Sequence, residues 1–517
     1  MRAAAPAFRL HPAVVRRMRA IALAAGMGLL SGCLSLAPPD DRPAAPIPAS
    51  FPDPSADATR ATSAAPTPES QAYFVDARLR ALIGQALTDN RDLRTAVARV
   101  EQARAVYGIR SADQWPTIGA GAAYARFRAP GGFLTPAPVI GQLYEVRLAE
   151  TQWELDFWGR VRNLKDAALQ RYLASDSAKR AVTLSVVTGV ANAYLTLCEI
   201  DERIALTRAT IDTRRESLQI FRLRHAAGAI SRLDLTQSEI LLQQAESLGV
   251  QLQQARATAA DALALLVGAP PALPDTPLAL DDGAVLPSLA PGLPSSLLIR
   301  RPDLIAAEHE LQATRANIGA ARAAYFPRIA LTSAAGTGSS ALHDLLSSGA
   351  GVWSVVPNVT LPLVDGGRNR SNLALSHAQR DEALAQYEKT LQRAFRDVSD
   401  ALAARHWLAD QVAIERATLA SQAERAHLAE LRYDSGATRF LEVLDARRDL
   451  MNAEQQLVMT RRALLSSRVA LYGALGGGVI DTGKTATATA ASRRPKSTSR
   501  PSCQGASPPC SSTKATS

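Results

Sequence analysis

The chain has 517 residues, of which 47% are hydrophobic, 5% aromatic and 21% charged. That length suits several domains or one elongated one, and an apolar fraction made largely of Ala and Leu favours closely packed helices. Residues 1–33 contain five arginines and no acid, and residues 479–517 contain six Lys or Arg against one Asp, so the two ends account for the whole formal charge of +10. Because the body between them is neutral, nucleic acid is not an expected partner.

The residues that carry chemistry form no catalytic or metal-binding pattern. Of the four cysteines, Cys198 is alone in the body, and Cys503 and Cys510 lie close to the C-terminus. The seven histidines lack HExxH spacing, and no GxSxG, Walker or GxGxxG signature occurs. We therefore expect no enzymatic activity, no cofactor and no metal site.

The N-terminus has the features of an export signal. Its arginines precede an apolar run from Ile21 to Leu30, which is too short to span a bilayer. The run ends in Leu30-Ser31-Gly32-Cys33, which resembles the lipobox of bacterial lipoproteins. This predicts removal of residues 1–32 and lipidation of Cys33. The alternative is an ordinary signal peptide that happens to contain a cysteine.

The segment after Cys33 is predicted to be a tether. From Ala37 to Pro68 it is rich in Pro, Ala, Ser and Asp and has no core of its own. No Asp lies beside Cys33, which by resemblance to sorted lipoproteins implies the outer membrane. No run of 18 or more apolar residues follows, so the protein is held by lipid, by membrane strands or by both.

The body is internally duplicated. Two motifs recur at an offset of 208 residues, Arg-x3-Gly-x4-Leu-acid-aliphatic from Arg224 and Arg432, and Gly-Arg-x-Arg from Gly159 and Gly367. A third motif, Arg-Ala-x2-Gly-x6-aromatic-Pro, recurs from Arg104 at an offset of 211. Each copy therefore contains a helix, an aromatic-Pro stop, an irregular segment, a long helix, a Gly turn and a further helix.

The positions of proline indicate how long the helices are. The chain has 30 Pro, but none lies between Val139 and Ala269 or between Leu363 and Arg494. Since Pro inside a helix costs about 3 kcal/mol, these gaps predict uninterrupted helix, first of all over 160–226. The following helix has a heptad-like spacing that predicts a coiled-coil seam of Leu241, Ala245, Leu248, Leu252, Ala255, Ala259, Ala262 and Leu266.

Between the aromatic-Pro stop and the Gly-Arg start, the hydrophobic period changes to two. Trp353, Val355 and Val359 share one parity, which predicts a strand paired with a partner over 328–333. In the first copy, apolar residues are even-numbered up to Leu148 and odd-numbered from Trp153, which predicts a bulge near Ala149 in the partner of a strand over 117–128. Four strands cannot close a membrane barrel, so other chains must complete it.

These residues resemble the TolC-like outer membrane factors, specifically efflux lipoproteins of the NodT or OprM type. The resemblance covers about residues 73–478. It is carried by Trp153-Glu-Leu-Asp-Phe-Trp-Gly-Arg160, Arg301-Pro-Asp-Leu304, Ile318-Gly-Ala-Ala-Arg-Ala-Ala-Tyr-Phe-Pro327, Leu361-Pro-Leu-Val-Asp-Gly-Gly-Arg368 and Leu471-Tyr-Gly-Ala-Leu-Gly-Gly477.

The resemblance implies a mainly α fold with a membrane β-barrel. Three chains would form a homotrimer with a 12-strand barrel and a 12-helix periplasmic barrel. A periplasmic adaptor and an inner membrane pump, usually of the resistance-nodulation-division class, would be its partners. The predicted segments are a signal peptide (1–32), a lipidated cysteine with its tether (33–72), a first repeat (73–269), an inter-repeat segment (270–297), a second repeat (298–478) and a disordered basic tail (479–517).

The resemblance also implies a closure of the pore at the periplasmic end. In such channels a Leu and an Asp four residues apart ring the pore, and the matching positions here are Leu441 and Asp445, with Arg448 one turn on. In the alternative reading, Leu441 is a seam residue matching Leu233, and Asp445 only forms an exposed pair with Arg448. The first repeat lacks the same Leu-Asp pair.

We expect a passive outer membrane conduit that exports small amphiphilic compounds. A duct for secreted polypeptides and a coiled-coil scaffold without a pore are the two alternatives. The tail departs from the family pattern, and its two cysteines could pair or be incidental.

Overall fold

The fold is described from a computed structural model of the chain. The described residues are 35–39, 46–48, 51, 73–130, 137–271, 273, 277–285, 298 and 300–477. The predicted signal peptide and Cys33 lie outside them, as does all of 479–517 with Cys503 and Cys510. The unit that ends at Gly478 is the one described below.

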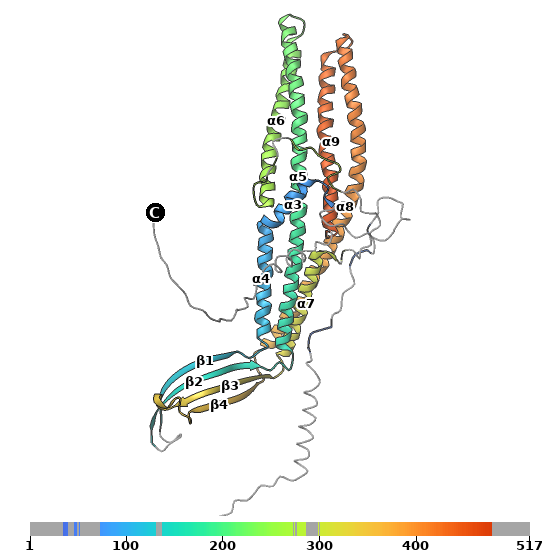
Figure 1. Ribbon diagram of the computed structural model, residues 1–517. Coiled ribbons are helices and arrows are strands. Elements are labelled where there is room, and N and C mark those ends of the chain that lie inside the picture. Colours follow the sequence, from blue (N-terminus) through green and yellow to red (C-terminus); the bar gives the residue numbers. More distant parts are fainter. Residues whose placement is uncertain are drawn as a thin grey trace, which may run out of the picture. The chain divides into compact units, whose positions relative to one another are not determined.

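The elements of the body occur twice in one order, a helix, two strands, a long helix and a second helix (Figure 1). The first series is preceded by a short helix, α3 (Ala77–Asp89), and a 3-10 turn, η2 (Leu342–Asp344), lies between the strands of the second. The first series is α4 (Arg91–Ala112), β1 (Ile118–Ala129), β2 (Val139–Glu154), α5 (Arg160–Ala226) and α6 (Arg232–Val267). The second is α7 (Pro302–Ala323), β3 (Arg328–Ser339), β4 (Gly351–Thr360), α8 (Arg368–Asp434) and α9 (Phe440–Ala474).

The two long helices have the same length, 67 residues each, or about 100 Å at roughly 1.5 Å per residue. The bounds predicted for α5 are confirmed. Both helices follow a glycine in the left-handed region, Gly159 (φ 71°) and Gly367 (φ 86°). Gly228 (φ 73°) and Gly436 (φ 75°) then turn the chain into α6 and α9. The repeated glycines therefore mark positions where a side chain would strain the backbone.

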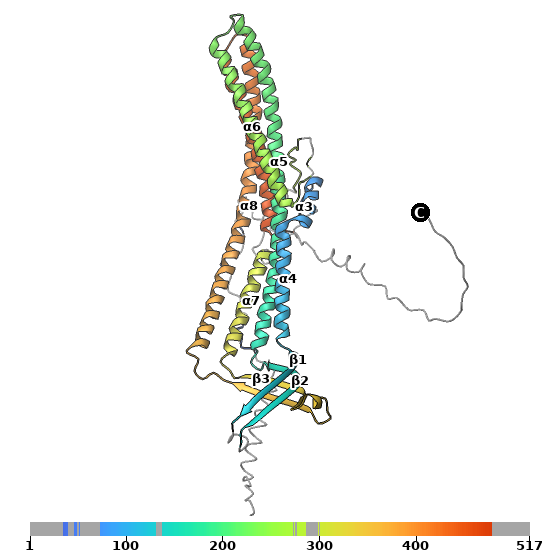
Figure 2. The same ribbon diagram turned by 90° about the vertical axis from the view of Figure 1, so that its left-hand side faces the viewer.

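Four of the helices form one layer, and two of these four, α5 and α8, continue into helical hairpins with α6 and α9. Neighbours in the layer are α4, α5, α7 and α8 in that order, and α6 and α9 pack on α5 and α8 (Figure 2). Among the described helices, only α5 is long and apolar enough to cross a membrane. More than half of its apolar window is buried inside the chain, and α5 packs on five helices, so we assign this apolarity to helix packing.

The predicted seam on α6 is correct in its first half and partly wrong in its second, where Ala259 and Leu266 pack against the core but Ala255 and Ala262 do not. Ala245 and Leu252 are buried, and Leu241 and Leu248 are partly buried. Further along, Ala255 and Ala262 are exposed, and Leu263 and Val267 are buried instead. A straight helix has 3.6 residues per turn and drifts by about 20° per heptad, so its contact stripe leaves a strict heptad pattern.

The main core lies where the inter-repeat segment crosses the helices. Tyr73 stacks on Tyr472 there and Phe74 meets both rings edge-on, with ring centroids 4.6 to 5.5 Å apart. The inter-repeat residues 277–285 pack against this cluster through Leu278, Leu280, Ala284 and Val285. The segment is therefore part of the core rather than a loose connection.

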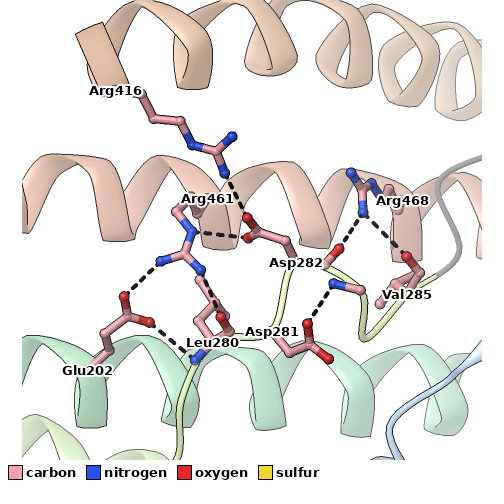
Figure 3. A network of polar contacts seen from close by, with 9 residues as sticks. Glu202, Leu280, Asp281, Asp282, Val285, Arg416, Arg461 and Arg468 are labelled. Atoms are coloured by element: carbon pink, nitrogen blue, oxygen red, sulfur yellow. Dashed lines mark hydrogen bonds and ion pairs between the residues drawn. The ribbon is translucent and has the colours of Figure 1, made fainter. Parts of the chain in front are cut away.

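Arginines fasten the same segment to three helices (Figure 3). Arg461 of α9 donates to Glu202 of α5 at 2.7 Å, to Asp282 at 3.0 Å and to the Leu280 carbonyl at 2.8 Å. Arg416 of α8 donates to Asp282 at 2.8 Å. Arg468 donates to the carbonyls of Asp282 and Val285. Residues 277–285 therefore link α5 of the first repeat to α8 and α9 of the second.

The four strands form one antiparallel sheet in the order β1-β2-β3-β4. The predicted bulge is present between Glu150 and Trp153 of β2, where Gln152 has a φ of 59°. Strand β3 is longer than predicted, and β1 is shifted by one residue. Neither β1 nor β4 has a second partner strand among the described residues, so both edges of the sheet are open.

Candidate functional site

The two faces of the sheet differ in chemistry. Residues directly opposite one another in an antiparallel pair point to the same face, so the register assigns each side chain. One face, termed the apolar face, carries Ile118, Tyr124, Tyr144, Val146, Leu148, Leu331, Trp353, Val355 and Val359, with Arg126, Arg128 and Gln142 confined to the hairpin end of β1 and β2. Trp353 is 80% exposed and Val359 64% exposed, so the chain itself leaves these side chains largely uncovered.

The opposite face, termed the small-residue face, is lined mainly by Gly, Ala, Ser and Thr. It carries Gly119, Gly121, Ala123, Ala125, Glu145, Arg147, Ala334, Gly336, Gly338, Ser354, Asn358 and Thr360, with Phe127, Val139, Leu143, Val352 and Val356 as its larger apolar members. Glu145 and Arg147 form an ion pair at 3.4 Å. Exposed aromatic and β-branched residues on one face and small or polar ones on the other are typical of a membrane barrel wall.

The bulge in β2 keeps Trp153 on the apolar face. Trp153 is opposite Leu331, and Leu148 is opposite Ala335, which share that face. The extra residue of the bulge lies between them, and the Glu150 carboxylate accepts a hydrogen bond from the Trp153 backbone N–H at 2.6 Å. The change of parity in the sequence therefore reflects one inserted residue, not a change of face.

A cluster around Glu154 joins the sheet to the helices. Its carboxylate accepts two hydrogen bonds from Arg160 at the start of α5, at 2.8 and 2.7 Å, and pairs with Arg328 at the start of β3 at 2.7 Å. Trp158 donates to the Pro327 carbonyl at 2.8 Å and stacks on Phe326. The motif that runs from Trp153 to Arg160 is therefore the joint between β2, α5 and the second repeat.

The corresponding joint of the second repeat depends on Asp365. Its carboxylate accepts hydrogen bonds from the backbone N–H groups of Gly367 and Asn369, both at 2.9 Å. These bonds, that from Asn369 above all, lower the pKa of the Asp365 carboxyl. The Arg301-Pro-Asp motif has a similar role, since Arg301 pairs with Asp303 and donates to the Ala474 carbonyl at 2.8 Å, which joins α7 to the end of α9.

The three residues predicted at the helix tips lie on the first turns of α9. Asp445 and Arg448 form an ion pair at 3.2 Å, with their side chains 40% and 50% exposed. Leu441 is 48% exposed, while its neighbours Phe440 and Val443 are buried. Within the chain, Leu441 therefore lies outside the seam, unlike in the alternative interpretation that made it a seam residue. The exposed Asp445–Arg448 pair that the same alternative predicted does form.

The structure places further contacts at the tips that the sequence did not indicate. Phe440 packs on Phe221 of α5 with ring centroids 4.0 Å apart. Arg224 of α5 donates to the Tyr433 hydroxyl of α8 at 3.1 Å. Asp449 pairs with Arg425 at 2.8 Å, and this hydrogen bond, followed by that from Arg448, lowers the pKa of the Asp449 carboxyl. The only available signal was that Arg224 and Arg432 occupy matching places in the two copies.

No cluster of three or more His, Cys, Asp or Glu suited to a metal ion occurs within the described residues. Cys198 is buried on α5, and its burial raises the pKa of the thiol to about 12. Such a cysteine is unsuited to act as a nucleophile.

Known proteins match most of the chain. A model of a family described as outer membrane efflux protein matches residues 82–269 and 293–477. Outer membrane protein OprJ of Pseudomonas aeruginosa is 42% identical over 456 residues, which cover 87% of this chain and 94% of OprJ. The solvent efflux pump outer membrane protein SrpC of Pseudomonas putida is 39% identical over 458 residues, which cover 87% and 96%.

Solved structures agree with these sequence matches. A membrane protein from Pseudomonas aeruginosa has a TM-score of 0.81 at 41% identity and covers 86% of this chain and 100% of that one. The open state of the MtrE outer membrane channel of Neisseria gonorrhoeae has a TM-score of 0.77 at 34% identity and covers 86% and 99%.

Proposed function

The chain belongs to the outer membrane efflux protein family, and on that premise we propose that three copies close into one channel. The protein is located in the outer membrane, has a large periplasmic helical part and is the outer membrane component of an efflux pump. That role implies partnership with a periplasmic adaptor and an inner membrane pump. The family is one of channels rather than enzymes.

The observation that carries the trimer is that both layers of the chain end in open edges. Strands β1 and β4 are the sheet edges, and α4 and α8 are the two ends of the helical layer. Backbone groups left unpaired in hydrocarbon are costly, so the sheet edges require partner strands. Three chains supply 12 strands, and the four helices of each layer, α4, α5, α7 and α8, add up to 12 helices. The contact of α5 with α7 would recur as a contact of α8 with α4 of the next chain.

The apolar face is proposed to meet lipid and the small-residue face to line the pore. We propose that small amphiphilic compounds pass through it. The channel itself supplies no energy, which comes from an inner membrane pump of the resistance-nodulation-division class. Small side chains and one ion pair leave few specific contacts for cargo. The relatives SrpC and TtgI, whose names refer to solvent and toluene efflux, support compounds of this type.

Adjacent residues of β4 test the channel and its orientation. Val355 is on the apolar face and Ser354 on the small-residue face. Val355→Asp should reduce assembly, because a charged side chain on the lipid face of a barrel is destabilising, by about 2 to 4 kcal/mol for Arg or Lys at the midplane and by less for Asp. Ser354→Asp should assemble and increase cation selectivity in a planar bilayer. Assembly of Val355→Asp at the parental level would contradict the assignment of faces. Absence of conductance from the parental protein would favour the scaffold instead.

Cys33 is proposed to be the acylated mature N-terminus. The Leu30 to Cys33 sequence supports this, and mass spectrometry of the purified chain measures it directly. Cys33→Ser should leave a precursor with weaker membrane attachment, while the strands still anchor the assembled channel. A mature chain that starts elsewhere, or an unmodified Cys33, would contradict the proposal.

Leu441 and Asp445 are proposed to close the pore at the tips, with Arg448 as the countercharge of Asp445. The side chain of Leu441, about half of which its own chain leaves uncovered, supports this. Spacing of four puts both residues on one face of α9, so three leucines and three carboxylates would converge on the trimer axis. Leucines there would exclude water, and carboxylates would attract cations.

The double variant Leu441→Ala, Asp445→Ala tests the gate. We expect a higher single-channel conductance and inward leakage of large antibiotics such as vancomycin. The matched control is Leu233→Ala, Gln237→Ala at the same positions of the first repeat, which should change neither. Unchanged conductance in an assembled gate variant would return both residues to a structural role.

A further inference from the structure

A short segment just after the predicted lipidation site is held by two helices. The Ser35 hydroxyl donates to the Asn163 side-chain oxygen of α5 at 3.0 Å. Arg322 of α7 donates to the Leu36 carbonyl at 3.1 Å. Asn163 is only 2% exposed, so its oxygen is available to few partners other than Ser35. We call residues 35–39 the strap, and Asn163, Gly319 and Arg322 its seat.

Gly319 leaves the space that the strap occupies. A Cβ atom at Gly319 would lie 2.9 Å from the Ala37 nitrogen and 2.7 Å from the Asn163 amide nitrogen, both too close for a side chain. Within one chain the matching positions form no seat, because Gly108 of α4 has open space around it and Ser371 of α8, which matches Asn163 at the offset of 208, is exposed. The two would meet only across the proposed contact between chains, and Ser371 lacks the amide group of Asn163.

The seat lies where the helices meet the sheet. Asn163 is in the first turn of α5, which starts six residues after the end of β2 at Glu154. Arg322 is in the last turn of α7, which ends five residues before β3 starts at Arg328. Further along the N-terminal segment, Phe51 is buried and stacks on Phe395 of α8, with ring centroids 4.8 Å apart. The segment is therefore fixed to the body at two places.

We propose that the seat docks the lipoprotein N-terminus and holds acylated Cys33 at the junction of helices and sheet. The inference rests on the acylation of Cys33 proposed above. Cys33 is two residues from Ser35, so chain geometry limits the distance between their Cα atoms to about 7 Å. The acyl chains would then enter the membrane beside α5 and α7 of their own chain, at a fixed depth, rather than at the end of a free tether.

Disulfide formation between strap and seat tests the docking. Ser35→Cys with Asn163→Cys is compared with Ser35→Cys with Ser371→Cys, both in a background with Cys503 and Cys510 replaced by Ser. A specific protease site inserted within 52–72 then releases the N-terminal fragment on a non-reducing gel unless a disulfide retains it. We expect the seat pair to form at least about tenfold faster than the control pair, which meets only through the millimolar effective concentration of a short tether.

A second pair of variants tests the docking at a position other than the introduced cysteines, with one variant in the seat and one as its control. Gly319→Ala should reduce the yield of the seat disulfide severalfold, while Gly108→Ala should leave it unchanged. Both substitutions add one methyl group within a helix and have a similar effect on helix propensity, so the difference reports the seat. Trimer yield is measured for each variant, because disulfide yields are compared in assembled protein only.

Equal disulfide rates for the Asn163→Cys and Ser371→Cys pairs, or a Gly319→Ala variant that crosslinks like the parent, would overturn the seat. The mass of the released N-terminal fragment reports acylation of Cys33 independently. An acylated fragment that fails to crosslink contradicts the seat alone. A non-acylated fragment that crosslinks contradicts the lipidation of Cys33, and with it the role of the seat as an anchor point for lipid.

Discussion

Glu154 is the residue on which the joint between sheet and helices depends most directly. Its carboxylate is 10% exposed and pairs with Arg160 and Arg328, which belong to different repeats. The sequence motif around it was recognisable, but the partner Arg328 lies 174 residues away, and no local pattern could connect the two. A short-range motif thus turned out to be one half of a long-range contact.

Glu154→Gln should therefore lower the free energy of unfolding by about 2 kcal/mol, because two arginines lose a charged partner in a buried place. The matched control is Glu145→Gln on the same strand, because the Glu145 side chain is 24% exposed and, among the described residues, pairs with Arg147 alone at 3.4 Å. Its loss should stay below about 1 kcal/mol. Urea denaturation of the purified protein in detergent measures both. Equal midpoints for the two variants would show that the Glu154 cluster contributes no more than a surface pair.

Cys198 is the second residue with a definite expectation. It is 2% exposed, and burial raises the pKa of its thiol to about 12, so almost no thiolate exists at pH 8. In a variant with Cys503 and Cys510 replaced by Ser, a fluorescent maleimide should label the folded protein poorly and the denatured protein fully. The control has Cys198→Ser with Ser185→Cys, an exposed position of the same helix, and should be labelled while folded.

Among the elements, the helices were predicted best because their signals are local. The absence of proline and the repeated glycines gave the bounds of α5, and parity gave the strands and the bulge. The seam of α6 was wrong at Ala255 and Ala262 because a heptad pattern describes supercoiled helices, whereas the burial of Leu263 and Val267 depends on where α5 lies. No sequence pattern predicted the attachment of 277–285 by Arg461, because it joins three elements that are distant in sequence.

Strand β3 offers a sharp test of how closely the sheet is packed. A Cβ atom at Gly336 would clash with the Val146 carbonyl and lie 2.6 Å from Arg147 Cα, whereas at Gly338 the nearest atoms are 3.7 Å away. Both glycines are on the small-residue face. Gly336→Ala should therefore destabilise the sheet by about 3 kcal/mol and lower the yield of assembled channel, and Gly338→Ala should assemble normally. Parental assembly of Gly336→Ala would mean that β2 and β3 can separate at no cost.

At the scale of the whole molecule, we expect the body to fold and assemble without the tail. Residues 479–517 have a composition too poor in large apolar side chains to offset the entropy of ordering. A chain truncated after Gly478 should still form trimers and conduct, as measured by crosslinking and planar bilayer recordings. The control truncation after Ala470 removes Leu471 and Tyr472, which are 1% and 0% exposed, and should not assemble. Loss of trimers from the first truncation would show that the tail packs on the body.

The duplication determines how substitutions are distributed around the proposed ring of three chains. Its two copies share helices, glycine turns and strands, but they differ at individual places, with Gln237 where the second copy has Asp445 and Asn163 where the second copy has Ser371. Six identical copies would repeat every substitution six times around the circumference. Two fused, unequal copies let each substitution fall on alternate positions only, so charge and shape can be tuned at three places while the other three keep the geometry that closes the ring.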